Sequence, residues 1–162
     1  METWTNYFSS TASVAATLTG LIFVGLSVNV KKILVITKDH LPSRALGSLV
    51  LLTNIVVVSN LCLIPGQPIL FLGIELLIVS LIIWVAVTRV DLIMYRSVEI
   101  RYKGSYFRSL IYSQLSILPF LSAGVLFACH SRGGFYLLVP GVVFSLIKSM
   151  VDVWYLTVVI NK

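Results

Sequence analysis

The sequence predicts an all-α integral membrane protein, a single transmembrane domain (residues 1–162) built as a bundle of about five membrane-spanning helices. Three observations support this fold class. First, 58% of the residues are hydrophobic and only 11% are charged, whereas about one quarter of a soluble domain is charged. Second, five apolar runs each approach the roughly 20 residues that cross a bilayer as a helix. Third, the basic residues are concentrated between particular runs.

The apolar runs are rich in Val, Ile and Leu, which favour strands in water. Lipid overrides this preference, because only a helix or a closed barrel satisfies every backbone hydrogen bond within the bilayer. A barrel would show segments of about ten residues with alternating apolar and polar side chains, and this sequence lacks that pattern. We therefore predict helices near residues 8–30, 45–65, 69–90, 109–129 and 135–160.

Local signals refine these helices in chain order. Residues 1–8 contain no Lys or Arg to form the basic start of a cleavable signal peptide, so the first helix should be retained. The uncharged connection 66–68 separates the second helix from the third. The third should continue past residue 90, or be followed by an interfacial helix, because the apolar residues there keep helical spacing. Pro119 and Pro140 lie within the fourth and fifth helices, where each removes a backbone hydrogen bond and predicts a kink.

The distribution of charge predicts how the chain sits in the membrane. Ten of the 12 basic residues lie in or beside residues 31–44 and 91–108, or at the C-terminus. Basic residues in short loops are held in the cytoplasm, so we predict two cytoplasmic loops, an N-terminus outside and a C-terminus inside. The net charge of +6 then requires no nucleic-acid partner. These side chains either anchor the protein by snorkelling or dock anionic lipid.

Charged side chains inside the apolar runs are the main candidates for function, because each costs roughly 2.5–3.5 kcal/mol at the bilayer centre. Lys148 and Asp152 are four residues apart and should form an ion pair on one face of the fifth helix. Ser145 and Ser149 extend that face. The face must meet protein or water, so it is a buried pair between helices, part of an aqueous pathway or gate, or a contact for another protein.

Glu75 has no polar neighbour on its own predicted helix, so its partner must come from another element. The second helix runs antiparallel to the third and carries Asn60 at a comparable depth and Asn54 nearer the midplane. One reading is a protonated Glu75 bonded to Asn60, since desolvation favours the neutral carboxyl. The other is a proton or cation site. Gln114 lies at a depth similar to that of Asp152, and the sequence leaves a contact between them open.

The first helix carries a stripe of small and hydroxyl side chains, many of them four residues apart. Such residues let helix backbones approach closely and are enriched at packing interfaces in membranes. The stripe therefore predicts either tight helix packing or the lining of a narrow pore, and a pore between copies would combine both roles. Its members are Ser13, Ala16, Thr17, Gly20 and, further along, Ser27.

Catalytic and metal-binding motifs are missing. The sequence contains no HExxH, CxxC, GxSxG, Walker lysine loop or GxGxxG pattern. His40 and His130 should lie on opposite sides of the membrane, where they cannot share a metal. We therefore expect no enzyme activity, no metal and no cofactor. Cys62 and Cys129 both fall near outer helix ends, where either a disulfide or two separate thiols is expected.

Four segments of the first half resemble a group of small bacterial multipass membrane proteins. The segments read AATLTGLIFVGLSVNVKKIL, LPSRALGSLVLL, PGQP and LGIELL. The resemblance implies a multipass protein of the bacterial inner membrane, directs attention to Glu75 and Asn29, and implies no particular activity. Lys148 and Asp152 lie outside it. The positions that match the group's recurring motifs are 17–29, 41–45, 65–67 and 75–77.

Two functions fit these features. The first is a homo-oligomeric, channel-like protein that conducts ions or small solutes, with several copies around the path because five helices of this size can hardly enclose one. The second is a non-conducting accessory or regulatory subunit that binds another membrane protein through its small-residue faces. Both functions imply contact with the lipid bilayer.

Overall fold

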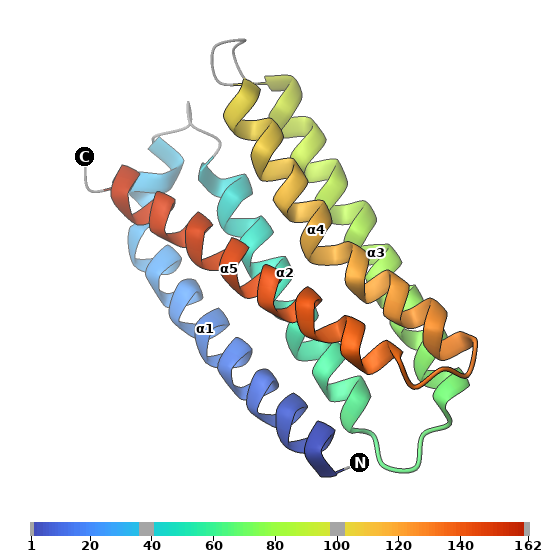
Figure 1. The fold of residues 1–162 in the computed structure, drawn as a ribbon. Helices are drawn as coiled ribbons and strands as arrows, with labels where there is room; N and C mark the ends of the chain where they lie inside the picture. The colour runs from blue at the N-terminus through green and yellow to red at the C-terminus, as the bar shows by residue number, and fades with distance from the viewer. Residues whose placement is uncertain (1, 36–40, 98–102, 161–162) are drawn as a thin grey trace.

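The computed structural model describes residues 2–35, 41–97 and 103–160, and it is helical throughout apart from two short connections. Figure 1 shows five helices packed side by side. Each contains a segment of 19 to 26 residues that is long and apolar enough to cross a membrane. The prediction of an all-helical, multipass membrane architecture is therefore confirmed. The helices are α1 (Glu2–Val35), α2 (Leu41–Leu63), α3 (Ile69–Ser97), α4 (Lys103–Ala128) and α5 (Gly134–Ile160).

Several helices are longer than the apolar runs that predicted them. Helix α3 continues to Ser97 without a break, as the helical spacing beyond residue 90 indicated. Residues 31–35, 41–44, 91–97 and 103–108, which the sequence assigned to the two connections 31–44 and 91–108, are helical. A helix need not stop where its apolar run ends, because its backbone hydrogen bonds are internal. The remaining loop residues, with His40, lie outside the described part of the chain.

Helices α2, α3, α4 and α5 form a four-helix ring in which each packs against two neighbours, whereas α1 lies outside it. Helix α1 packs along α2 and makes a smaller contact with α5. The N-terminus, the α2–α3 connection and the α4–α5 connection share one end of the bundle, here called the N-terminal end (Figure 1). The last residues of α1, α3 and α5 mark the opposite, C-terminal end.

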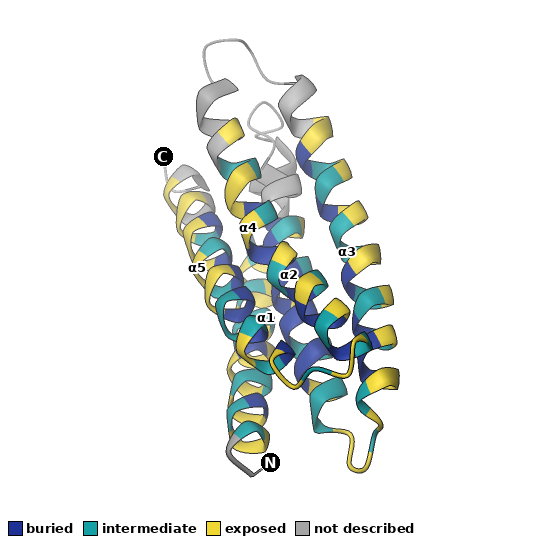
Figure 2. Ribbon diagram, turned by 45° about the vertical axis from the view of Figure 1, so that its right-hand side comes forward, coloured by how far each residue is buried: buried dark blue, intermediate teal, exposed yellow. Residues whose placement is uncertain are grey.

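The apolar core has two parts. A large cluster fills the N-terminal half and includes Phe8, Phe120, Phe127 and Leu138, each almost fully buried. A smaller cluster nearer the C-terminal end consists of Leu51, Val87 and Ile117. Figure 2 shows the exposed residues on the outward sides of the helices. Many of these are large apolar residues, which suits contact with lipid tails rather than water.

Glycine allows α3 and α4 to pack unusually closely. A Cβ on Gly73 would lie 2.5 Å from the backbone nitrogen of Ala128, and one on Gly124 would lie 2.8 Å from the Leu77 side chain. Close approach through small residues was predicted for the first helix, but a Cβ on Gly20 would meet nothing within 4 Å. Within one copy, these glycines therefore bring α3 and α4 into close contact.

The start of α1 is fixed to the start of α5 by aromatic rings. Trp4 stacks on Phe135 with ring centroids 5.4 Å apart and meets Tyr136 edge-on at 5.1 Å. Phe135 also meets Phe127 of α4 at 4.8 Å. Aromatic pairs of this kind add favourable quadrupole interactions to the burial of their area. This cluster packs the start of α1 against α4 and α5 at the N-terminal end of the bundle.

Candidate functional site

The four-helix ring has a polar interior. Ten polar or charged side chains are buried in the described part of the chain, and all ten belong to α2–α5. The polar faces, which were predicted to meet a neighbouring helix or water, are here buried between the helices of a single copy. The ten are Ser48, Asn54, Ser59, Ser80, Asp91, Ser113, Ser116, Ser145, Ser149 and Asp152.

Lys148 and Asp152 form the predicted ion pair. Both side chains are nearly buried, with 10% and 6% of their side-chain surfaces exposed. The Ser149 hydroxyl donates to the carbonyl of Ser48 on α2 at 3.3 Å, and the Ser145 hydroxyl donates to the carbonyl of Ser116 on α4 at 3.4 Å. The polar face of α5 is therefore turned into the bundle, between α2 and α4.

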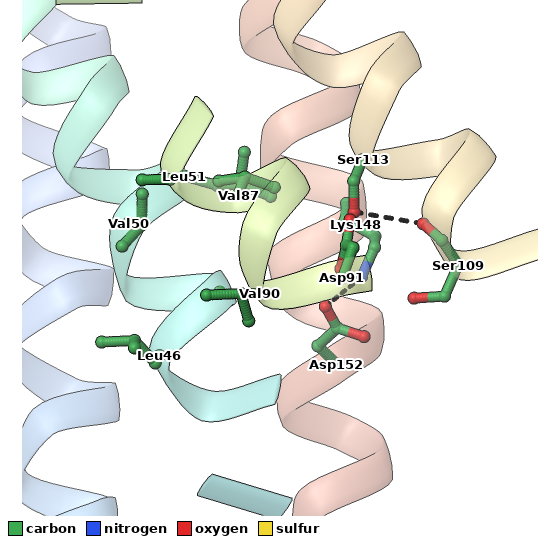
Figure 3. Close-up of a pocket in the computed structure, with 12 residues that line it drawn as sticks. Leu46, Val50, Leu51, Val87, Val90, Asp91, Ser109, Ser113, Lys148 and Asp152 are labelled. Atoms are coloured by element: carbon green, nitrogen blue, oxygen red, sulfur yellow. Dashed lines mark hydrogen bonds and ion pairs between the residues drawn. The ribbon is translucent and has the colours of Figure 1, made fainter. Parts of the chain in front are cut away.

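A cavity of about 80 Å³, here called the core cavity, lies beside this ion pair and is lined by residues of all four ring helices. It is several times larger than the roughly 10–15 Å³ that one water molecule needs. Figure 3 shows its polar lining, which comes from α3, α4 and α5, and its apolar lining, which comes from α2 and α3. Its charged and hydroxyl residues are Asp91, Ser109, Ser113, Lys148 and Asp152.

Asp91 is the functional candidate that the sequence reasoning missed. It falls at the start of the predicted loop 91–108 and was not among the predicted site residues, but it is buried on α3 with 9% of its surface exposed. The unbroken helical pattern through residue 97 was the signal that could have found it, because Asp91 lies one turn after the buried Val87. Asp91 therefore joins Lys148 and Asp152 around the core cavity.

Glu75 has a different partner from the one predicted. The Gln67 Nε2 donates a hydrogen bond to the Glu75 Oε2 at 2.6 Å. Asn60 is exposed, and its Nδ2 donates to the carbonyl of Val56 on its own helix at 2.8 Å. The proposed Glu75–Asn60 bond is therefore wrong, because Asn60 points away from the bundle while the α2–α3 connection brings Gln67 back over α3.

Gln114 joins α4 to α3, and its side-chain hydrogen bonds go to residues other than Asp152. Its Oε1 accepts a hydrogen bond from the Trp84 indole at 2.7 Å, and its Nε2 donates to the Thr88 hydroxyl at 3.1 Å. These bonds use both ends of the amide. Gln114 therefore acts as a crosslink between helices, and the sequence reasoning did not connect it with Trp84 or Thr88.

Asn54 is completely buried at the middle residue of the α2 span, which runs from Ala45 to Leu63. Neither its Nδ2 nor its Oδ1 has a hydrogen-bond partner in the described part of the chain. The hydroxyls of Ser59 and Ser80 are also buried and lack a hydrogen-bond partner among the described residues. Buried polar groups nearly always have partners, so this region is chemically unusual.

The stripe on α1 faces outward. Its hydroxyls donate to carbonyls four residues earlier, as in Thr17 to Ser13 at 2.8 Å and Ser27 to Phe23 at 2.8 Å. The Asn29 amide does the same to Gly25 at 2.9 Å. The stripe is thus not an internal packing face of one copy, and its role between copies stays a prediction. Its exposed members are Ser13, Ala16, Thr17, Gly20 and Ser27.

The cysteines and the possible metal ligands add no further functional group to the candidate site. Cys62 and Cys129 are free thiols, without the disulfide that the sequence left open. Among the described residues, no three His, Cys, Asp or Glu side chains are grouped so that they could hold a metal ion.

Comparison with known proteins gives no relative from which a function could be transferred. No protein-family model, no curated protein and no solved structure matches this chain. The candidate site therefore rests on its own geometry.

Proposed function

We propose that the chain is a channel-like membrane protein that conducts ions or small solutes through the polar interior of its own four-helix ring, and that copies associate as a homo-oligomer. One observation carries this proposal. The core cavity, the Lys148–Asp152 pair and the other buried polar side chains all lie inside one copy. A path within each copy therefore fits the geometry better than a path on an axis shared between copies.

The ion pair supports a functional role rather than a purely structural one. Burying two charges costs desolvation energy, and replacing such a pair by apolar side chains is often neutral or stabilising. A bundle that only had to stay folded would gain little from Lys148 and Asp152. Beside a cavity that can hold water, the same charges can attract, orient or exchange a passing ion.

The proposed path is closed in this structure. From the core cavity towards the N-terminal end, the interior holds a few buried polar side chains but is mainly filled by the large apolar cluster that includes Phe120, Phe127 and Leu138. Apolar constrictions of this kind block ion passage by excluding water. Conduction therefore requires a second state in which this region is hydrated.

Orientation and location complete the proposal. We infer an N-terminus outside and a C-terminus inside, because basic positions of the described helices, such as Lys31, Arg44 and Lys103, lie towards the C-terminal end of the bundle. The resemblance of the first half to bacterial multipass proteins supports the bacterial inner membrane. A reporter that is active only in the cytoplasm, fused after Lys162, should be active. The same reporter fused before Glu2 should be silent, and the reverse pattern would contradict the orientation.

Conduction is tested with purified protein in liposomes. We expect flux of protons, K⁺ or Cl⁻ above that of protein-free vesicles, measured with an ion-sensitive dye under an applied voltage. Lys148→Met with Asp152→Leu should abolish this flux, whereas Asn60→Leu, on the exposed side of α2, should retain it. Wild-type protein that gives no flux of any of the three ions at any pH or voltage would contradict the proposal.

A non-conducting accessory subunit is the second candidate, and the outward face of α1 favours it. Helix α1 packs on one side only, and Gly20 has open space beyond it. Gly20→Leu should weaken assembly, whereas Gly25→Leu, also open but about 140° around the helix, should not. Native mass spectrometry from gentle detergent distinguishes the candidates, because loss of a self-complex supports the homo-oligomer and loss of a different bound protein supports the subunit.

A further inference from the structure

The side-chain amide of Asn54 has no hydrogen-bond partner in the described part of the protein. Its side chain is fully buried at mid-span, and both its oxygen and its nitrogen lack a hydrogen-bond partner. The amide offers two N–H donors and one carbonyl acceptor. Leaving these donors and the acceptor without hydrogen bonds is unfavourable in an apolar interior. Asn54 should therefore bind a polar molecule in at least one state of the protein.

By helical register, three apolar side chains occupy the positions between the polar lining of the core cavity and the level of Asn54. Val87 lies one helical turn deeper in the bundle than Asp91, and Ile117 lies one turn deeper than Ser113. Leu51 takes the corresponding place on α2. These three residues pack together as the smaller core cluster, here called the apolar barrier (Leu51, Val87 and Ile117).

Asn54 lies directly beyond this barrier. It follows Leu51 by three residues on the same face of α2, about 4.5 Å further towards the N-terminal end. The core cavity, whose lining includes Lys148 and Asp152 but is mostly apolar, is on one side of the barrier, and the unsatisfied amide is on the other. A thin apolar layer between two places that offer polar groups is the arrangement of a hydrophobic gate.

We propose that Asn54 is a second polar binding site, which binds water and the solute that is hydrated by it. The apolar barrier is then the gate between this site and the core cavity. Water matches the chemistry, because it both donates and accepts hydrogen bonds. The hydroxyls of Ser59 on α2 and Ser80 on α3 are also buried without partners, and they offer further hydrogen-bonding groups to the same water and solute. This inference rests on the proposed channel-like function, because a gate has a role only in a protein that conducts.

The test measures access of water to residue 54. Asn54→Cys is made in the full-length chain with Cys62→Ser and Cys129→Ser, and the protein is placed in lipid nanodiscs. The rate of modification by a small, positively charged methanethiosulfonate is then measured with and without Leu51→Ser. We expect slow modification with Leu51 in place and a rate higher by about tenfold or more once the barrier is made polar.

Two further variants make the result specific. Leu52→Ser alters an equally buried leucine that belongs to the large core cluster, and it should leave the rate unchanged. Gly47→Phe fills the core cavity from a position where a Cβ meets nothing within 4 Å, and it should slow the reaction again in the Leu51→Ser background. If Leu51→Ser does not give a monodisperse helical protein, Ile117→Ser replaces it.

Equal acceleration by Leu51→Ser and Leu52→Ser would overturn the inference, because it would show general loosening rather than a gate. A folded Leu51→Ser protein with an unchanged rate would overturn it too. The rate reports access and not flux. Failure of the proposed conduction would therefore appear separately, as absent ion flux from a protein that still shows the expected modification pattern.

Discussion

Gln67 and Glu75 are joined side chain to side chain, with the Gln67 amide nitrogen 2.6 Å from a Glu75 carboxyl oxygen. The bond ties the α2–α3 connection to α3 at the N-terminal end of the bundle. Asp91, which lines the core cavity, is 16 residues further along α3, or about 24 Å. Glu75 therefore belongs to the closure of the N-terminal end rather than to the core cavity.

Gln67→Leu should lower the free energy of unfolding by about 1–3 kcal/mol, because it removes the partner of a half-buried carboxyl. Asn60→Leu is the matched control and should be nearly neutral, since Asn60 is exposed and bonds only to its own helix. Unfolding by sodium dodecyl sulfate in mixed micelles measures both. A larger loss for Asn60→Leu would restore the Glu75–Asn60 pairing that the sequence suggested.

The Lys148–Asp152 pair should show strong coupling between its members. Lys148→Met alone should cost about 3–5 kcal/mol of unfolding free energy, because it leaves the Asp152 carboxylate buried without its cation. Adding Asp152→Leu should recover most of that loss. The same unfolding assay completes the double-mutant cycle. Additive losses from the two single variants would show that the pair is not coupled in the folded protein.

Gly73→Ala should destabilise the bundle by about 1–3 kcal/mol, because the new methyl group meets the α4 backbone at Ala128. Gly20→Ala should instead stabilise it by about 0.5–1 kcal/mol, since a mid-helix glycine is replaced in open space. Thermal unfolding in detergent, followed by circular dichroism, compares the two. Equal responses would contradict the close α3–α4 approach.

His130 follows the end of α4 in the left-handed region, with φ of 58°. The Ser131 N–H bonds to the Leu126 carbonyl and the His130 N–H to the Phe127 carbonyl, which completes a Schellman cap. His130→Gly should raise the unfolding free energy by about 1 kcal/mol, because a side chain at this φ is strained. Cys129→Gly, outside that region, should lower it. A loss of stability in His130→Gly would argue against the cap.

The features predicted correctly depend on local spacing. Five apolar runs are enough to predict five helices, and a separation of four residues is enough to place Lys148 beside Asp152. The cost of exposing charge to lipid predicts that the polar α5 face meets protein or water, and the structure shows the first of the alternatives left open, burial between helices. None of these inferences needs to know which helix packs against which.

The features that were missed depend on the packing of separate helices. The Gln67–Glu75 bond follows from the path of a connection, and the Gly73 contact needs the position of α4. Asp91 falls within the predicted loop 91–108 and was not named as a candidate, whereas the helix continues through it and its side chain is buried. The polar ring interior emerged only when α2–α5 were seen to enclose it and α1 was seen outside.

The central claim is that each copy carries its own path, and a subunit-mixing experiment tests it most directly. Wild-type protein is co-reconstituted in increasing ratio with the Lys148→Met, Asp152→Leu variant at constant total protein, and ion flux is measured per liposome. Independent paths inside the four-helix rings predict that flux falls in direct proportion to the wild-type fraction. A steeper fall, in which one variant copy silences its neighbours, would place the path on a shared axis and contradict the account.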